Sequence, residues 1–147
     1  MIKIIPFKKE HAEFIAQSKM NRPLMNVKER FWKSLKELET KDTSWTAIDE
    51  YQNIIAAGGM VEIWDQVYEG WVMATANIEK HKIVIPKHIK KIFDEVMPRY
   101  NVQRLQTSVE ENYAVGHRFA QWLGLKQEGL MKKYINGQNH YRYARIY

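Results

Sequence analysis

The chain has 147 residues, of which 45% are hydrophobic, and a formal net charge of +6. It contains no cysteine, which excludes disulfide bonds, thiolate metal sites and a cysteine nucleophile. No apolar stretch approaches the roughly 18 residues that a membrane-spanning helix needs, and lysines and glutamates are scattered near the start. We therefore expect one soluble, cytoplasmic domain over residues 1–147, with neither a signal peptide nor a membrane span.

The positive charge is concentrated in the second half of the chain. Residues 1–73 carry 10 Lys and Arg against 11 Asp and Glu, whereas residues 74–147 carry 13 against 6. A basic half suits nucleic acid or a small polyanion such as a phosphorylated cofactor, and it equally suits an ordinary solvated surface.

The first forty residues predict a strand and two helices. Residues 2–5 form a short apolar run that a proline ends, and residues 8–19 and about 26–40 show helical periodicity. Residues 20–25 contain a proline and are expected to form a loop. The expected inward faces of the two helices consist of His11, Phe14, Ile15, Ser18, Val27, Phe31, Leu35 and Leu38.

Three strands are expected next, over residues 44–51, 54–64 and 68–77. The last two are joined by a turn near Asp65-Gln66. Gly58-Gly59 lies inside the second of these strands and indicates a bulge or a close approach of another backbone.

The remaining elements alternate between helix and strand. A helix is expected to start at Pro86, which suits the first helical position, and to stop before Pro98. A strand follows over residues 102–110. The expected core faces of these two elements consist of Ile89, Ile92, Phe93, Val96, Leu105, Thr107 and Val109.

A last helix and a hairpin complete the chain. Asn112 is expected to cap the helix and Gly124 to occupy the position just after it. Asn136-Gly137 predicts a tight hairpin turn between two final strands. The inward face of the helix is expected to consist of Val115, Phe119, Trp122 and Leu123.

The resulting order, β-α-α-β-β-β-α-β-α-β-β with a mixed sheet of the α/β (α+β) class, resembles the GNAT family of acyl-CoA N-acyltransferases. The segment NYAVGHRFAQWLGL at 112–125 resembles the family's last helix. KQEG at 126–129, KKY at 132–134 and the Asn-Gly hairpin resemble the final strands of the branch that acetylates ribosomal proteins and protein amino termini. AAGG at 56–59 is also similar to GNAT-like internal virion proteins of tailed phages.

The resemblance implies an acetyl-CoA-dependent N-acetyltransferase that acts on an amine of a protein or a small molecule. In that fold the fourth and fifth strands splay apart, and the pantetheine of the cofactor pairs with the edge of the fourth. The amine is expected in a cleft between residues 20–25 and the last hairpin. The residues expected to hold the cofactor are Met73, Ala74 and Thr75 in the fourth strand, Lys80, His81 and Lys82 in the following basic loop, and Asn112 and Arg118 on the last helix.

Acyl transfer to an amine needs a base for the amine and a proton for the leaving thiolate. Glu69, at the start of the fourth strand, and Glu110 and Glu111, at the end of the fifth, are candidate bases, although carboxylates at strand ends are commonly just exposed. His117 is a candidate proton donor or phosphate contact, although a lone helix histidine more often has a structural role. Ser108 is a candidate for a water bridge to the thiolate.

Two departures from the family pattern support an alternative, a catalytically degenerate GNAT-like phage, virion or binding protein without transferase activity. Family members usually carry a glycine-rich loop whose backbone N–H groups surround the cofactor pyrophosphate. Residues 77–86 contain no glycine. In addition, Ala120 stands where the family usually has a general-acid tyrosine.

Nucleic acid is a more distant alternative partner. The tyrosines at 134, 141, 143 and 147 alternate with basic residues and are candidates for a stacking surface, although an amphipathic strand pair has the same pattern. The five histidines never occur at helical spacings of three or four, so no helical metal pair is expected. The acceptor and the oligomeric state remain open.

Overall fold

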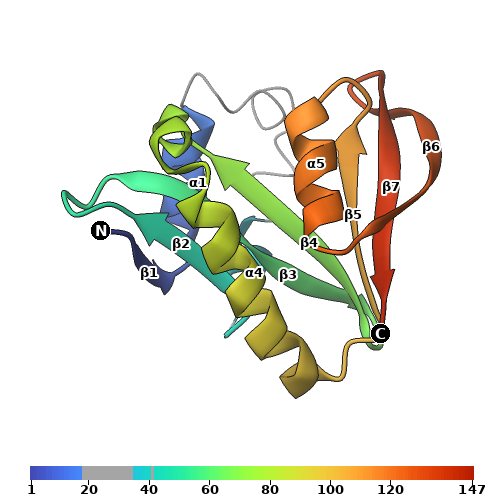
Figure 1. The fold of residues 1–147 in the computed structure, drawn as a ribbon, viewed down its shortest axis with the longest axis horizontal. Coiled ribbons are helices and arrows are strands. Elements are labelled where there is room, and N and C mark those ends of the chain that lie inside the picture. Colours follow the sequence, from blue (N-terminus) through green and yellow to red (C-terminus); the bar gives the residue numbers. More distant parts are fainter. Residues whose placement is uncertain (18–34, 41) are drawn as a thin grey trace. The chain divides into compact units, whose positions relative to one another are not determined.

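The structure is a computed structural model that describes residues 1–17, 35–40 and 42–147 (Figure 1). The expected loop 20–25, most of the expected second helix, and Ser18, Val27 and Phe31 lie outside these ranges. The elements are β1 (Lys3–Pro6), α1 (Lys9–Ala16), the 3₁₀ helix η1 (Leu35–Leu38), β2 (Ser44–Ile48), β3 (Ile54–Trp64), β4 (Val67–Ala74), the 3₁₀ helix η2 (Ala76–His81), α4 (Val84–Val96), the 3₁₀ helix η3 (Met97–Tyr100), β5 (Arg104–Glu110), α5 (Ala114–Trp122), β6 (Lys126–Ile135) and β7 (Gln138–Ile146).

The strands form one mixed sheet in the order β1-β2-β3-β4-β5-β7-β6. β1 pairs with β2 and β2 with β3 in antiparallel fashion, whereas β4 and β5 are parallel. β7 is antiparallel to both β5 and β6. Along the chain, helices alternate with the strands of this mixed sheet, so the expected mixed α/β class is confirmed.

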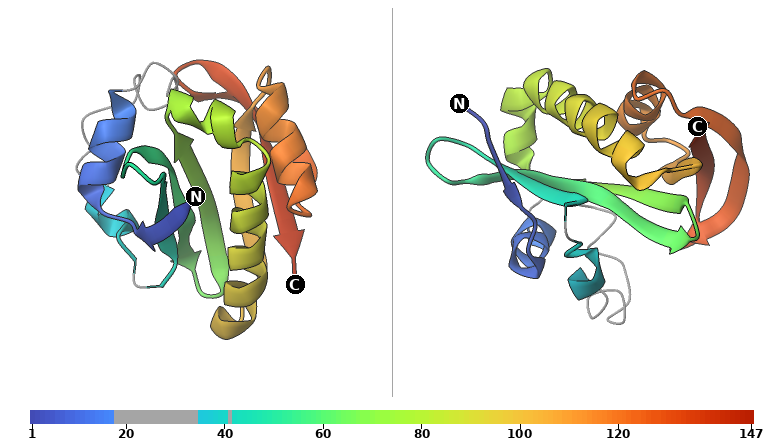
Figure 2. Two further views of the ribbon diagram at one scale, coloured as in Figure 1. Left: turned by 60° about the vertical axis from the view of Figure 1, so that its left-hand side comes forward. Right: turned by 90° about the horizontal axis from the view of Figure 1, so that it is seen from below.

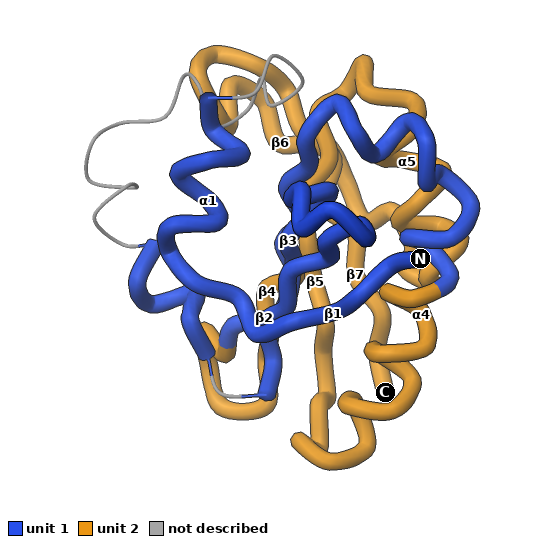
Figure 3. Tube along the Cα trace, turned by 90° about the vertical axis from the view of Figure 1, so that its left-hand side faces the viewer, with its two compact units in different colours: residues 1–61, 71–87 blue, residues 62–70, 88–147 orange. Residues whose placement is uncertain are grey.

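The chain divides into two compact units (Figure 3). Unit 1 consists of residues 1–61 and 71–87, and unit 2 of residues 62–70 and 88–147. β4 belongs to unit 2 as far as Gly70 and to unit 1 from Trp71 onward.

Unit 1 is held together by apolar side chains from its strands, α1 and η1. Figure 2 shows α1 and η1 on the same face of the unit 1 strands. The rings of Phe7 and Trp71 meet edge to face with centroids 4.8 Å apart. The buried members of this core are Phe7, Ala12, Ile15, Leu35, Ala57 and Met73. Ile15 and Leu35 were expected in the core, and both are confirmed.

The glycine pair in β3 is explained by a close backbone approach. A Cβ atom added to Gly58 would lie 2.9 Å from the carbonyl oxygen of Trp71. A Cβ added to Gly59 would lie 2.7 Å from Cα of Ser44 and would also collide with the carbonyl oxygen of Thr43. The irregularity in the β2–β3 pairing lies elsewhere, between Ala47 and Ile48. Of the two sequence expectations, the close approach is therefore correct at both glycines.

Unit 2 is built on β5 and β7, with α5 packed against β5 and β6. Leu105 and Val109 of β5 are buried, which confirms the face expected from alternation. The hairpin turn between β6 and β7 has positive φ at both central residues, 51° at Asn136 and 75° at Gly137. These angles are typical of the tight turn that an Asn-Gly pair predicts, so this turn is confirmed.

Several expected boundaries are wrong. The end of the expected helix 26–40 contains the 3₁₀ helix η1. The expected strand 68–77 ends at Ala74, and η2 begins at Ala76. α4 starts at Val84, two residues before Pro86. This start is compatible with proline because the first helical turn needs no donor from that residue.

The cap expected at Asn112 is also wrong. The N-cap of α5 is Tyr113, because its N–H donates to the carbonyl of Glu110 at 3.0 Å and this turn delays the helix by one residue. Gly124 does follow the helix with φ of 89°, as expected.

Three residues expected in the core are exposed. Phe14, Val115 and Trp122 have 55%, 56% and 43% of their surface accessible. Both α1 and α5 are short, so one buried stripe is enough to dock each of them. In α5 that stripe includes Ala120 in place of Val115.

Candidate functional site

A polar face runs across the strands of unit 2. Glu69 of β4 pairs in register with Gln106 of β5, and Ser108 of β5 pairs with Arg142 of β7. Register partners point to the same side of a sheet, and residues two apart on a strand do so as well. The four side chains therefore share one face, which we call the polar face, while Leu105, Thr107 and Val109 point to the other.

The centre of the polar face is an ion pair between Glu69 and Arg142. Nη1 of Arg142 donates to both carboxylate oxygens of Glu69, at 3.2 Å and 3.3 Å. The side chains of Arg142 and Glu69 are 18% and 29% exposed. Nη2 of Arg142 is directed toward the hydroxyl of Tyr134, 3.4 Å away on β6.

Burial raises the pKa of the Glu69 carboxyl above its ordinary value. Arg142 and Gln106 act in the opposite direction, since both stabilise the carboxylate through hydrogen bonds and Arg142 also through its charge. The raised pKa shows that desolvation outweighs these partners. A carboxyl of this kind takes up a proton more readily than an exposed glutamate does.

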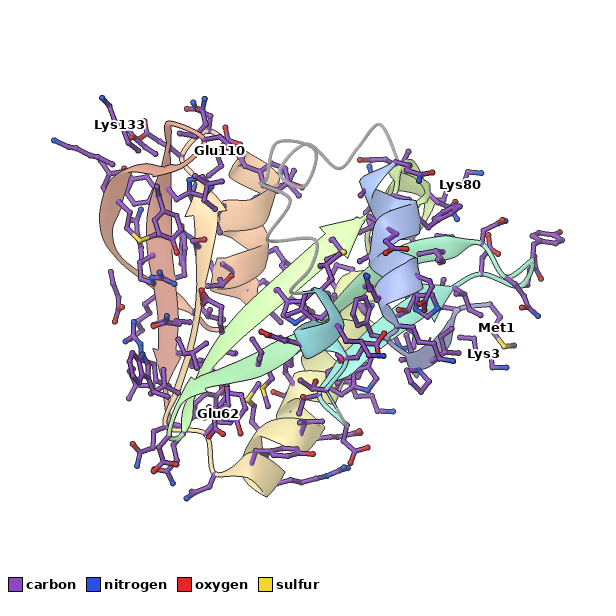
Figure 4. All side chains as sticks on the ribbon, turned by 180° about the vertical axis from the view of Figure 1, so that it is seen from behind. Met1, Lys3, Glu62, Lys80, Glu110 and Lys133 are labelled. Atoms are coloured by element: carbon purple, nitrogen blue, oxygen red, sulfur yellow. The ribbon has the colours of Figure 1, made fainter. Side chains whose placement is uncertain are left out.

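Two further candidates from the sequence lie on or near this face. Ser108 is half-buried opposite Arg142, and Glu110 ends β5 opposite His140. Figure 4 shows Glu110 at the end of the strand. Neither residue forms a hydrogen bond with Glu69 in the described part of the chain, and the two lie two and four residues along β5 from Gln106, the register partner of Glu69.

His117 lies on the opposite side of these strands from Glu69. Its Nδ1 is 2.7 Å from the hydroxyl of Tyr143, and its Nε2 is 3.0 Å from the carbonyl oxygen of Glu111. Tyr143 pairs with Thr107, which faces away from the polar face. The structure therefore brings Glu69 and Ser108 onto one face and leaves His117 apart from them.

The expected cofactor residues of β4 belong to unit 1. Met73 is buried in the core of unit 1, and Ala74 is the last residue of β4. The hydroxyl of Thr75 lies within hydrogen-bonding distance of the carbonyl oxygens of Ile54 and Ile55 and accepts from the backbone N–H of Asn77. Thr75 is thus the N-cap of η2 and fixes the start of the glycine-free segment.

The expected basic loop is the end of η2. Lys80 and His81 are its last residues, and Lys82 is its C-cap (Lys80 is labelled in Figure 4). Lys80 and His81 line an open pocket of about 700 Å³ in unit 1, whose other walls include Phe14, Asp49 and Asn77. The carboxylate of Asp49 accepts from the backbone and side chain of Asn53, from the backbone of Tyr51 and from the side chain of Asn77.

The remaining expected cofactor residues, Asn112 and Arg118, are exposed in unit 2, before and within α5. The hairpin tyrosines do not form a single stacking surface, because Tyr143 is only 1% exposed. In the part of the chain that the structure describes, no helix is long and apolar enough to cross a membrane. Within the same residues, no three His, Cys, Asp or Glu side chains are grouped to hold a metal ion.

No family model matches this sequence, and no curated protein matches it either. Solved structures do match. A GNAT family acetyltransferase from Bacillus anthracis superposes with a TM-score of 0.72 at 13% identity, covering 99% of this chain and 94% of that one. The chain has the GNAT fold.

Other structures with the GNAT fold align over the same extent. The ribosomal-protein-S5-alanine acetyltransferase from Vibrio fischeri has a TM-score of 0.72 and 17% identity, covering 99% of this chain and 92% of that one. A mutant of the spermidine N-acetyltransferase from Vibrio cholerae has a TM-score of 0.72 and 16% identity, with 99% and 93% covered. The GNAT fold expected from the order of elements is therefore confirmed.

Sequence reasoning named Glu69 but missed its partners Arg142 and Gln106, and it missed the contact of Arg142 with Tyr134. Gln106 could have been found from the parallel pairing of the fourth and fifth strands. Arg142 was not accessible in this way, because the Asn-Gly turn fixes the pairing of β6 with β7 and leaves the register of β7 against β5 undetermined.

Proposed function

We propose that the chain is an acetyl-CoA-dependent N-acetyltransferase in which Glu69 removes a proton from the acceptor amine. The observation that carries the proposal is the partly buried Glu69 carboxyl with its raised pKa, on the polar face of a chain with the GNAT fold. A general base is most effective when its pKa lies near the working pH, and a raised glutamate pKa moves it in that direction.

Both protons that leave the amine nitrogen in the proposed reaction have an acceptor. Glu69 takes one proton from the ammonium group and passes it to solvent, which leaves a neutral amine with a free electron pair. Acetyl-CoA supplies the acetyl group as a thioester, so that a C–N bond forms while the C–S bond breaks and the amine's second proton goes to the thiolate. Only the neutral amine reacts, so deprotonation is where this chain contributes directly.

The positive charge of the basic residues in unit 1 is complementary to the negative charge of the cofactor's phosphates. Lys80 and Lys82 are exposed cations on either side of His81, at the end of η2 and close before α4. Such side chains attract phosphate without a glycine-rich loop. We propose that they hold the phosphates, that the backbone of residues 73–75 holds the pantetheine, and that Asn112 and Arg118 contact the cofactor from α5.

The other candidates take smaller roles in this proposal. Ser108 lies on the polar face and is suited to hold water near the thiolate, and Glu110 is a second carboxylate further along β5. Both nitrogens of His117 are already engaged by Tyr143 and Glu111, which favours a structural role for this histidine.

The test is release of free thiol from acetyl-CoA in the presence of a panel of amines. Glu69→Gln keeps the size of the side chain and removes the base, and we expect kcat to fall by about 100-fold or more. Glu95→Gln, at an exposed carboxylate of α4, is the matched control and should leave the rate unchanged. Equal rates for both variants would remove Glu69 from the mechanism.

The competing proposal is a GNAT-like binding protein, of phage or other origin, without transferase activity. It is favoured by η2, which takes the place of a glycine-rich loop, and by Ala120, which is buried where the family usually has a tyrosine. A melting temperature that does not change in millimolar acetyl-CoA, with no thiol released for any amine, would decide for this alternative.

A further inference from the structure

The two arginine–carboxylate pairs of unit 2 differ in geometry. Arg104 uses both terminal nitrogens of its guanidinium on Glu128, with Nη1 at 3.0 Å from Oε2 and Nη2 bonded to Oε1. Arg142 gives Glu69 only Nη1, which is shared between the two carboxylate oxygens. The first pair is a complete fork, and the second leaves half of the guanidinium for other partners.

The other partners of Arg142 are weak ones. Nη2 lies 3.4 Å from the hydroxyl of Tyr134 and 3.6 Å from Sδ of Met131, and the guanidinium carbon is 5.8 Å from the centre of the Tyr134 ring. Charge-assisted N–H···O bonds are normally about 2.7–2.9 Å long. All four polar contacts that Arg142 makes with the described residues are longer than this, so among these residues the guanidinium has no strong bidentate acceptor.

We propose that Glu69 and Arg142 together recognise a zwitterionic acceptor, an amino acid or another amine with a carboxylate close to its ammonium group. The ammonium lies against Glu69 and the carboxylate takes the fork of Arg142. This inference rests on the proposed function, because it names the acceptor of that reaction. The short separation of the two side chains requires that the two charges of the ligand also lie close together.

The arrangement selects against other amines. A polyamine has no carboxylate to accept hydrogen bonds from Arg142, and its second cation would be repelled by the guanidinium. A simple alkylamine would leave the Arg142 fork unused. An amino acid fills both halves of the pair, and Gln106 and Ser108 on the same face supply further polar contacts for it.

The experiment compares amino acids with their methyl esters as acceptors, measured by release of free thiol from acetyl-CoA. We expect kcat/KM to be at least tenfold higher for the acids than for the esters. Arg142→Gln should remove this preference mainly through KM, and Arg142→Lys, which keeps the charge without the fork, should reduce it. Arg145→Gln is the matched control, because Arg145 is on the same strand but bonds to the carbonyl of Leu123 and should keep the preference.

The outcomes separate the inference from the proposed function. If esters are acetylated as well as acids, the inference is overturned and the transferase stands. If no amine is acetylated, calorimetry with the amino acids alone decides. Heat that is lost in Arg142→Gln and kept in Arg145→Gln then supports the binding site without a transferase, and absence of heat in the wild type overturns both.

Discussion

The hydroxyl of Tyr143 on β7 donates a hydrogen bond to Nδ1 of His117 on α5, across 2.7 Å. The proton assignment follows from the other ring nitrogen, because Nε2 lies 3.0 Å from the Glu111 carbonyl, which can only accept. His117 is therefore held as the tautomer that carries its proton on Nε2. This bond joins the last strand to the last helix inside unit 2.

Removal of the Tyr143 hydroxyl should weaken unit 2. Tyr143→Phe leaves Nδ1 of His117 without a donor, and we expect the free energy of unfolding to fall by about 1 kcal/mol. Urea unfolding followed by fluorescence measures this change. Tyr141→Phe is the control, because the Tyr141 ring also contacts His117 but its hydroxyl makes no such bond. Similar losses in both variants would contradict the prediction.

The raised pKa of Glu69 predicts how stability depends on pH. The folded chain holds this proton more tightly than the unfolded chain does, so ionisation above the ordinary value of 4.5 costs stability. Wild-type stability should therefore fall relative to Glu69→Gln as the pH is raised from about 4 to about 7. Denaturant midpoints of the two proteins across this range provide the measurement. A constant difference would show that the carboxyl titrates alike in both states.

The lowered pKa of His11 predicts the opposite dependence of stability on pH. Burial lowers its pKa below 6.5, with Lys8 acting in the same direction and Glu10 against it. The neutral ring accepts at Nδ1 from the backbone N–H of Lys8, and the same nitrogen lies 2.8 Å from the hydroxyl of Thr46. The stabilisation of the fold by the neutral His11 ring is complete above pH 6.5 and is lost as the pH falls through the pKa of the folded state.

The matching experiment compares wild type with His11→Gln between about pH 5 and about pH 7.5. The advantage of the wild type should grow as the pH rises. An advantage that grows on acidification would mean that the protonated ring is the stabilising form.

Glycine is required at position 59 and not at position 129. Gly59→Ala places a methyl group against the backbone of Thr43 and Ser44, and we expect a loss of about 3 kcal/mol. Gly129→Ala is the control, because nothing lies within 4 Å of its Cβ position. Its effect should stay within about 0.5 kcal/mol. Thermal unfolding of the two variants gives the comparison.

Local chemistry in the sequence predicts much of this fold. The Asn136-Gly137 turn, the 54–64 strand and the glycine after α5 each depend on neighbouring residues alone, and all three are present. The cap at Asn112 was missed because a turn from Glu110 to Tyr113 competes with it. The buried stripe of α5 was misjudged because periodicity shows that a helix has an apolar face but does not show how wide the buried part is.

The candidate site was predictable only in part. Glu69 was chosen for its chemistry and its place on a strand, and both are local properties. Its partner Arg142 is 73 residues away and is brought near by two sets of strand pairing that meet at β5. The unequal geometry of the two arginine pairs depends on side-chain placement, which no sequence pattern encodes.

The segment between β4 and α4 keeps its shape through side chains where related folds use glycine. Thr75 ties its start to the backbone of β3, and Asn77 ties the next turn to the Asp49 carboxylate. Anyone who grafts a glycine-rich phosphate loop onto this scaffold would therefore have to retain these two anchors or redesign the β2–β3 turn with it. Because Asp49 lies in the β2–β3 turn, we expect changes in that turn to alter the backbone conformation of the segment that carries Lys80 and Lys82, although the two are distant in sequence.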